Sequence, residues 1–346
     1  MKNVLLYLTT FLFLAGLTSA QENNPKFSGL MFGDYFYNAA NHDSTQKDLN
    51  GFQFRRIYIT TDYTISDNFS SRFRLEADQG EITNNGKITT MVKDAWLKWK
   101  DIFTGSDLIF GISPTPAFDV SEGAWGHRYL EKTIMDLTGT VPSRDLGIDL
   151  KGKFDKDGVA KYWVKIGNNS GNAPEVNKFK RYYGLLEFDF TQNLLLTLYG
   201  DYASFPKVMD PFDNQTKDNS AFVFAGFINY KQKGSFGLGA EGFMKSQQNQ
   251  TPNSDVNPTS LKSQNGFGVS LWAYVNFTET IQLVGRFDTI DPNTDKDKDG
   301  RNLILAGLQF NPVKNVSITP NVEVFTYQKS GVDSDVTPRI TFNWEF

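Results

Sequence analysis

The feature that constrains the fold most is a two-residue alternation of apolar and polar side chains along most of the chain. In residues 337–346 one face is apolar: Ile340, Phe342, Trp344 and Phe346. Segments 69–77 and 281–288 alternate in the same way, and helical periodicity is almost absent. Such alternation is typical of half-buried β-strands, because successive side chains of a strand point to opposite faces. The sequence therefore predicts an all-β protein.

The connections between the alternating runs are alternately short and long. Short polar turns such as 66–68, 191–193 and 278–280 are followed by longer polar loops, of which 113–144 is the longest. This order places all short turns at one end of a sheet and all long loops at the other. We count sixteen candidate strands: 26–37, 51–65, 69–80, 88–100, 107–112, 145–154, 159–167, 181–190, 194–205, 221–231, 235–245, 266–277, 281–290, 302–311, 316–328 and 336–346.

An even strand number with both ends on the short-turn side is typical of a transmembrane antiparallel β-barrel of the bacterial outer membrane. The mean hydropathy of -0.40 excludes helical spans only, because in a barrel every second residue meets lipid. The 14% aromatic content fits the aromatic girdles of such barrels. A secreted β-sandwich or propeller also alternates, but the aromatic residues near strand ends and the terminal Phe346 favour the barrel.

Two further features of the composition exclude several classes of function. The net charge of -4 lacks the basic excess of nucleic-acid binders, so no nucleic-acid partner is expected. The absence of cysteine excludes disulfides, thiolate metal sites and cysteine nucleophiles.

Residues 1–20 have the pattern of a cleaved signal peptide. Lys2 is followed by an apolar core at 4–17 and by a small-residue cleavage site at 18–20. An uncleaved anchor is the alternative, but the apolar core is short for a membrane span. We expect export and a mature domain at 21–346, localised in the bacterial outer membrane.

Five segments in order resemble phosphate-selective porins of the O and P type, and the chain looks like a Bacteroidetes-like member of that family. They are 51–59, 73–78, 92–99 with its Lys-Asp-Ala-aromatic motif, 110–116, and 142–150 with its Arg-Asp-x-Gly motif. The resemblance covers about the first half of the mature chain. It implies a sixteen-stranded homotrimeric porin in contact with outer-membrane lipid and lipopolysaccharide. The last three residues, 344–346, resemble the signal by which barrel assembly machinery recognises a terminal phenylalanine, here Phe346.

Charged residues opposite the lipid-facing positions are expected to line the lumen. The predicted pore-lining and selectivity residues are Arg56, Arg72, Arg74, Lys93, Lys98, Arg286, Arg339, Glu76 and Asp94; Asp149, Glu323 and Glu345 alternate with them in the same sense. Selectivity depends on pore width and on the charges at the narrowest point. Arg56, Arg72 and Arg74 lie on neighbouring strands and could form a cationic ladder. The alternative is that most of these charges only hydrate the lumen.

The 113–144 loop is long enough to need a structural purpose, and we expect it to fold into the lumen and form the constriction. Its candidate residues are Asp119, Glu122, His127, Arg128, Glu131 and Lys132. Spacing of apolar residues gives 124–137 some helical character. An external cap or a trimer latch is the alternative. The acidic residues of this loop and the negative net charge argue against phosphate specificity.

The 295–300 loop carries carboxylates at alternate positions, Asp295, Asp297 and Asp299, followed by Gly300. Calcium loops use this pattern, so a structural Ca²⁺ site is a hypothesis here. The twelfth position is Ala306 where an EF-hand needs Glu, and a solvated acidic loop is the favoured alternative.

The sequence favours a passive diffusion channel for ions and small hydrophilic solutes, with no catalytic cofactor; whether it prefers anions or phosphate is left open. A non-conducting barrel with an adhesion or assembly role is the main alternative. An outer-membrane hydrolase is less favoured, because the two histidines, His42 and His127, lie in loops and no Gly-x-Ser-x-Gly motif occurs.

Overall fold

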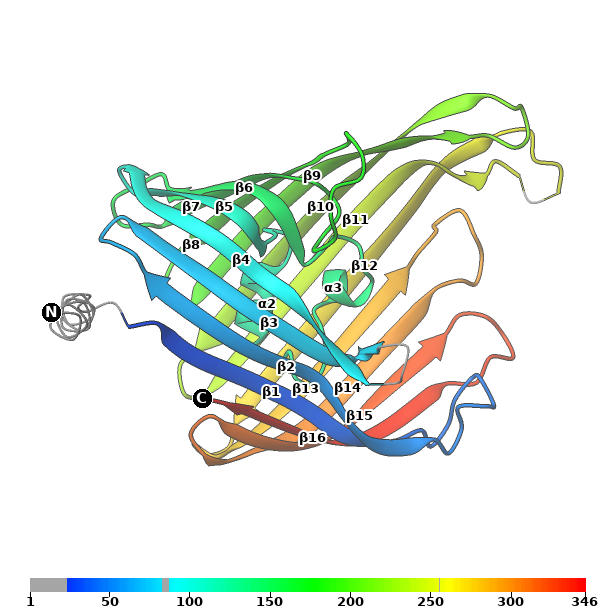
Figure 1. Ribbon diagram of the computed structural model, residues 1–346. Helices are drawn as coiled ribbons and strands as arrows, with labels where there is room; N and C mark the ends of the chain where they lie inside the picture. The colour runs from blue at the N-terminus through cyan, green and yellow to red at the C-terminus, as the bar shows by residue number, and fades with distance from the viewer. Residues whose placement is uncertain (1–23, 83–86, 255) are drawn as a thin grey trace, which may run out of the picture.

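The structure is a computed structural model that describes residues 24–82, 87–254 and 256–346 (Figure 1). The predicted signal peptide at 1–20 lies outside these residues. Sixteen antiparallel strands form one closed barrel, in which each strand pairs with its neighbours in sequence and β1 pairs with β16. The predicted fold class and strand number are therefore confirmed. No helix in the described part of the chain is long and apolar enough to cross a membrane.

The elements follow the predicted strand ranges closely. They are β1 (Lys26–Tyr37), β2 (Asn50–Thr64), β3 (Phe69–Ile82), β4 (Ile88–Phe103), β5 (Ser106–Pro114), α2 (Asp119–Trp125), α3 (Ile134–Leu137), β6 (Arg144–Lys153), β7 (Ala160–Gly167), β8 (Arg181–Asp189), β9 (Leu194–Met209), β10 (Thr216–Gln232), β11 (Phe236–Pro252), β12 (Leu261–Asn276), β13 (Ile281–Asp291), β14 (Arg301–Val313), β15 (Val316–Tyr327) and β16 (Asp335–Glu345). Strands β9 to β12 extend beyond the predicted ranges at the long-loop end, and the added residues of β10 to β12 are mainly polar.

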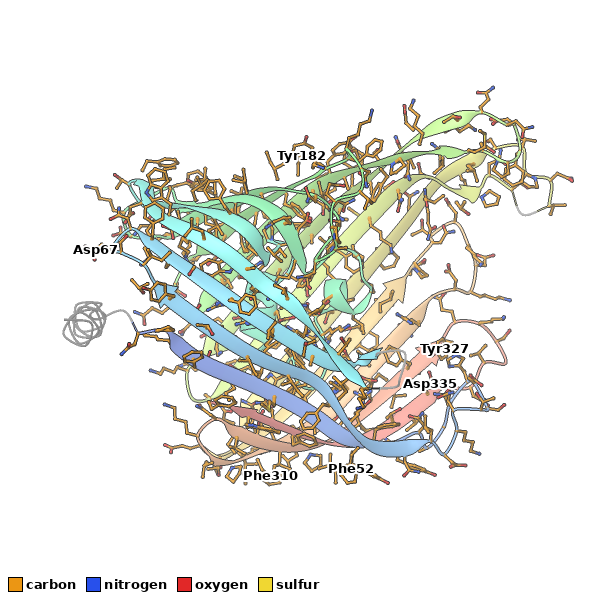
Figure 2. The ribbon with its side chains drawn as sticks, in the orientation of Figure 1. Phe52, Asp67, Tyr182, Phe310, Tyr327 and Asp335 are labelled. Carbon is orange, nitrogen blue, oxygen red and sulfur yellow. The ribbon has the colours of Figure 1, made fainter. Side chains whose placement is uncertain are left out.

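The two faces of the barrel wall differ in chemistry. The outer face exposes large apolar side chains such as Phe52, Tyr182 and Phe310, which Figure 2 shows on the outside of the ribbon. The inner face holds buried polar residues, among them Asp34 and Thr60. An outer belt of apolar side chains and an inner polar wall is the arrangement that lets a closed sheet cross lipid, because every strand edge is paired.

Two β-bulges break the strict alternation and turn consecutive charged residues to the same face. The register between β1 and β2 shifts after Phe32, and both Arg55 and Arg56 then point inward. A second shift between β3 and β4 places Lys93 and Asp94 together on the inner face, where both are buried. A bulge inserts one extra residue into one strand, so neighbouring side chains can share a face.

The ends of the barrel are unlike each other. Asp67 lies in a short turn at the end where the C-terminus also lies, whereas Tyr327 and Asp335 lie at the long-loop end (Figure 2). At the long-loop end Tyr327 donates a hydrogen bond of 2.6 Å to Asp335, and His42 Nδ1 lies 2.8 Å from the same carboxylate. This contact ties the first long loop to the last one.

The long segment between β5 and β6 contains two short helices rather than one. Helix α2 ends at Trp125 because Gly126 adopts a left-handed conformation, with φ of 67°. Thr133 is extended and starts α3. The expected helical character over 124–137 is therefore wrong for 126–133, where the glycine interrupts the helix, and the chain is helical at 119–125 instead.

Candidate functional site

The segment 115–143, here called the inner segment, packs against the inner wall through apolar side chains. Phe118, Ile134 and Met135 are buried among residues of β7 to β13, including Trp163 and Tyr199. Ile134 and Met135 are fully buried, and burial of each such side chain contributes about 1.5–3 kcal/mol. Figure 1 shows α2 and α3 between the walls of the barrel.

A second apolar cluster holds the middle of the inner segment. Trp125 and Leu130 pack with Phe32 of β1, Phe227 of β10 and Trp272 of β12. Together the two clusters connect the segment to an arc of wall that runs from β7 through β13 to β1.

Charged side chains of the wall fix the backbone of the inner segment. Arg55 donates hydrogen bonds to the carbonyl oxygens of Leu130, at 2.9 Å, and Tyr129. Arg286 donates to the carbonyl of Lys132. A guanidinium can satisfy several acceptors in one plane, which makes it suited to holding an irregular chain. Sequence reasoning missed Arg55, since strict alternation assigns it to the outer face.

Glu131 places its carboxylate between two guanidinium groups. Arg339 lies 3.8 Å and Arg55 lies 4.0 Å from Glu131, and Arg339 also pairs with Glu323 at 2.6 Å. Burial acts to raise the pKa of Glu131, but the two guanidinium groups outweigh it and lower that pKa. The carboxylate is therefore ionised at neutral pH and attracts both cations to the inner segment.

The wall formed by β2, β3, β4 and β6 carries a dense set of ion pairs. Glu76 lies 2.8 Å from Arg56 and 2.7 Å from Lys93. Asp94 lies 3.2 Å from Arg74 and also pairs with Arg144. These cations outnumber the two carboxylates they share, so this patch of wall, called the basic wall here, has a net positive charge.

The three arginines of the predicted cationic ladder do lie on adjacent strands, but each is paired. Arg56 and Arg74 pair as described, and Arg72 lies 2.7 Å from Asp62. Lys98, also predicted to line the pore, lies 3.2 Å from Asp107. The structure thus shows no free cationic row at these positions.

The inner segment presents acidic groups toward the basic wall. Glu122 and Asp136 each lie 3.1 Å from Arg128 and are also close enough to Arg56 to interact with it electrostatically. Asp119 interacts in the same way with Arg144. Opposed acidic and basic surfaces create a field across the space between them.

Two of the predicted pore residues are almost wholly buried. The Arg286 side chain is 1% exposed, pairs with Asp288 and lies 5.5 Å from the centre of the Trp125 ring. The Lys93 side chain is 7% exposed. Both lie on the inner face, in positions where they support the wall and the inner segment and have little contact with water. Sequence reasoning did not single out Arg144, Asp136 and Asp34, whose charges complete these ion pairs.

His127 is buried inside the barrel. Its Nε2 lies 2.5 Å from Gln282 and its Nδ1 lies 2.6 Å from the carbonyl oxygen of Trp125. Burial lowers the pKa of His127, so the ring is neutral at pH 7 and joins the inner segment to β13 through hydrogen bonds.

The acidic loop after β13 carries one ion pair, in which Asp295 lies 3.3 Å from Lys262. Asp297 and Asp299 follow in the same loop. Among the described residues no group of three His, Cys, Asp or Glu side chains is placed to hold a metal ion. The calcium site stays a prediction.

Several solved structures share this fold. The outer membrane channel DcaP of Acinetobacter baumannii aligns with a TM-score of 0.66 at 11% identity, over 95% of this chain and 99% of that one. The anion-selective porin of Comamonas acidovorans aligns with 0.67 at 10% identity, over 94% and 100%. OmpF of Salmonella typhi aligns with 0.64 at 14% identity, over 94% and 98%. No protein-family model and no curated protein matches the sequence. The chain therefore has the fold of outer-membrane porins.

Proposed function

We propose that this protein is an outer-membrane diffusion channel for ions and small hydrophilic solutes. The observation that carries the proposal is the closed barrel with an apolar outer face and a charged inner face. Charged side chains on an inner wall cost free energy unless water or ion pairs stabilise them, so the charged inner face is consistent with a hydrated lumen. The structural similarity to porins, at 10–14% identity, shows the same fold and is the reason for proposing the porin class of function.

The inner segment forms the constriction of the proposed channel. Its acidic groups Glu122 and Asp136 oppose the basic wall, and solutes pass between the two surfaces. A transverse field aligns polar solutes and disfavours apolar ones, since an apolar solute displaces ordered water without replacing its interactions. This mechanism needs no catalytic residue and no cofactor.

Ion preference follows from the pairing of the wall charges. Arg56, Arg72 and Arg74 each lie beside a carboxylate, which reduces their attraction for anions. The reduction is partial, because Glu76 and Asp94 also pair with Lys93 and Arg144. We therefore propose weak ion selectivity at the constriction and no phosphate specificity there.

Assembly as a homotrimer is part of the proposal. One structural neighbour, OmpT of Vibrio cholerae, is described as a trimer form and aligns with a TM-score of 0.60. Lipid and lipopolysaccharide are the proposed surroundings of the apolar outer face, and Phe346 is the proposed contact with barrel assembly machinery. Size measurement in detergent with multi-angle light scattering tests the trimer, and a monomeric mass would contradict it.

Liposome swelling tests the proposed function. Liposomes containing the refolded barrel are expected to swell rapidly in a small monosaccharide and slowly in a large oligosaccharide, because the constriction limits solute size. Swelling no faster than that of protein-free liposomes would instead favour the non-conducting barrel with an adhesion or assembly role.

A further inference from the structure

Five charged side chains meet where the inner segment contacts the wall near the pair formed by β1 and β16. Three are carboxylates and two are guanidinium groups: Glu131 of the inner segment, Asp34 of β1, Glu323 of β15, Arg55 of β2 and Arg339 of β16. This set is called the seam cluster here. Its side chains are only 0–17% exposed, so water solvates them poorly.

The two guanidinium groups of the seam cluster are shared among the three carboxylates. Arg55 lies 2.8 Å from Asp34 and 4.0 Å from Glu131. Arg339 donates hydrogen bonds of 2.6 and 3.1 Å to Glu323 and lies 3.8 Å from Glu131. If every group were ionised, three negative charges against two positive ones would leave a net charge of -1. An uncompensated charge is strongly unfavourable where water is largely excluded.

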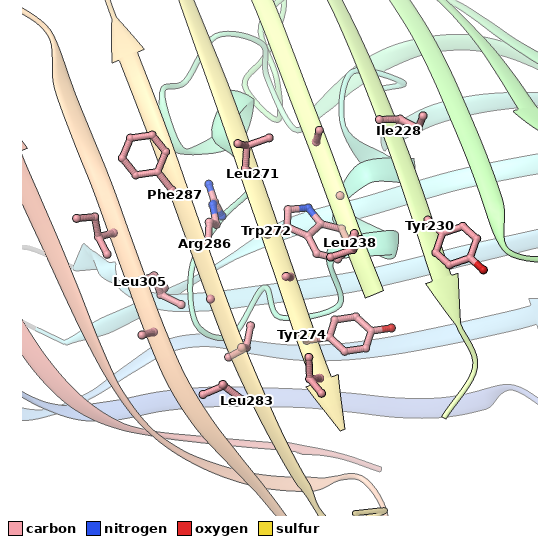
Figure 3. Close-up of a pocket in the computed structure, with 18 of the residues that line it drawn as sticks. Ile228, Tyr230, Leu238, Leu271, Trp272, Tyr274, Leu283, Arg286, Phe287 and Leu305 are labelled. Atoms are coloured by element: carbon pink, nitrogen blue, oxygen red, sulfur yellow. The ribbon is translucent and has the colours of Figure 1, made fainter. Parts of the chain in front are cut away.

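The surrounding wall does not balance this charge, because no third cation among the described residues pairs with these carboxylates. Arg286 of β13 is close enough to Glu131 to interact with it electrostatically, but it pairs with Asp288 at 2.5 Å. Leu305 of β14 lies between Arg286 and Glu323 in the strand register, and Figure 3 shows Arg286 and Leu305 on adjacent strands. This part of the wall therefore adds no net charge.

The inner segment does not supply the missing positive charge either. Lys132 donates its backbone N–H to Glu131 at 2.8 Å, and its ammonium group forms no ion pair in the part of the chain that the structure describes. Tyr129 donates its hydroxyl proton to Gln309, and burial raises the pKa of Tyr129, so the ring stays neutral. A proton on one of the carboxylates is the remaining way to neutralise the seam cluster.

Glu131 and Glu323 are placed to share such a proton. Two carboxyl groups form a hydrogen bond with each other only when one of them is protonated. Burial acts to raise the pKa of Glu131, while Arg55, Arg339 and a hydrogen bond with the Glu323 carboxyl group together lower it. With one proton between them the two glutamates carry a single negative charge, and the seam cluster is neutral.

We propose that the seam cluster holds one proton, shared by Glu131 and Glu323, and that loss of this proton releases the inner segment from the wall. Without the proton the two carboxylates repel each other where little water can screen them. Once the segment has moved away, both carboxylates are hydrated and need no proton. The undocked segment therefore binds fewer protons than the docked one at neutral pH, and docking weakens as the pH rises.

Trypsin cleavage of the refolded barrel at Arg128 or Lys132 measures the undocked population without requiring conduction. Rates at pH 7.5 and pH 9.0 are each divided by the rate for an unstructured peptide with the same sites, which removes the pH dependence of trypsin. One proton changes an equilibrium by at most about tenfold per pH unit, so wild-type cleavage should rise about tenfold over this range. His127 is neutral throughout, because histidine titrates at lower pH.

Two single variants test the charge count. Glu323→Gln and Glu131→Gln each leave two carboxylates for two guanidinium groups, so neither variant needs the proton. Cleavage of each should be nearly equal at pH 7.5 and pH 9.0, whatever its rate at pH 7.5. Glu187→Gln is the matched control, because Glu187 pairs with Lys161 of the neighbouring strand at 2.7 Å, and it should keep the wild-type pH dependence.

The proposal is overturned if wild-type cleavage does not change over this range. It is equally overturned if the tenfold rise persists in Glu323→Gln or in Glu131→Gln. The second variant lies in the inner segment and alters no strand, so it decides the question even where Glu323→Gln prevents assembly of the barrel.

Single-channel recording then connects the proton to transport, and only this step rests on the proposed channel function. Current noise of wild type should increase from pH 7.5 to pH 9.0 and stay constant in Glu323→Gln. The expected rise in cleavage with no measurable current would contradict the channel proposal and leave the proton site intact. A normal current with cleavage independent of pH would contradict the proton site alone.

Discussion

Replacement of Arg55 by methionine should release the inner segment from the wall. The change removes two hydrogen bonds from a charged donor to the carbonyls of Tyr129 and Leu130. Such bonds contribute about 1.5–3 kcal/mol each, and the 17% exposure of the Arg55 side chain favours the low end. Two of them total about 3 kcal/mol, which lowers the ratio of docked to undocked segment about 150-fold.

Trypsin cleavage measures this population directly, because Arg128 and Lys132 lie in the inner segment. When opening is fast relative to cleavage, the cleavage rate follows the open population. The Arg55→Met variant should therefore be cut at 128 or 132 about 100-fold faster than wild type. Higher current noise in single-channel recordings should accompany the cleavage.

Arg72→Met is the matched control. Arg72 also pairs with a carboxylate, at 2.7 Å, and that partner, Asp62, belongs to the neighbouring strand and not to the inner segment. Cleavage should stay within a few-fold of the wild-type rate. Equal rates in the two variants would refute the assignment of Arg55 as an anchor.

A second control separates the anchor from the stability of the barrel. Asp34 has a side chain with 0% exposure and lies 2.8 Å from Arg55, so Arg55→Met leaves a buried carboxylate short of a partner at a cost of about 3–5 kcal/mol. The double variant Arg55→Met/Asp34→Asn removes that unpaired charge. It should regain unfolding stability in denaturant while the inner segment stays sensitive to trypsin.

Three other predictions concern the inner segment and the outer loop. Deletion of 119–137 should raise the single-channel conductance severalfold, and an unchanged conductance would exclude the segment as the constriction; deletion of 296–299 from an outer loop is the control. Burial lowers the pKa of His127 in the docked segment. Below the ordinary histidine pKa of 6.5 the undocked segment therefore binds more protons than the docked segment. Docking of the inner segment thus weakens as the pH falls. Current noise should thus increase from pH 7.5 to pH 5.5 in wild type and stay flat in His127→Gln; a rise of the same size in the variant would assign the effect to another group. If the 295–300 loop binds Ca²⁺, millimolar calcium should release heat in wild type and none in Asp297→Asn, and no heat in wild type would leave it a solvated acidic loop.

The barrel could be predicted from the sequence because the two patterns that define it, side-chain alternation and connection length, are local. Alternation in segments such as 69–77 and 337–346 reports which side of each strand meets the apolar environment. The alternation of short and long connections then fixes an antiparallel order with an even count. The strand ends were less predictable in β10 to β12, because these paired strands continue beyond the apolar belt with mainly polar side chains.

The site was less predictable because it depends on contacts between distant parts of the chain. Arg55 points inward only because of the bulge opposite Phe32 and Gly33, and strict alternation cannot show a bulge. The inward position of Arg56, Arg72 and Arg74 was predicted from alternation. Their carboxylate partners were not, because they lie on adjacent strands and the sequence does not give the register between strands. A hollow at the short-turn end likewise combines residues of the inner segment, such as Trp125, with strand ends as far along the chain as Asn343.

The ion-pair network also explains why net charge is a poor guide to selectivity here. Most wall cations are compensated locally, as Arg339 is by Glu323. Four cations of the basic wall nevertheless share Glu76 and Asp94, and among the described residues Lys151, Lys231, Lys233 and Lys245 form no ion pair. Ion selectivity should therefore depend on these uncompensated charges more than on the net charge of the chain.

Single-channel recording in a planar bilayer tests the central claim most directly. The refolded barrel, placed between two potassium chloride solutions of different concentration, should give discrete current steps and a small reversal potential, as expected for a hydrated pore whose wall charges are largely paired. Absence of current steps under conditions where the barrel is folded and inserted would contradict the account of this protein as a diffusion channel.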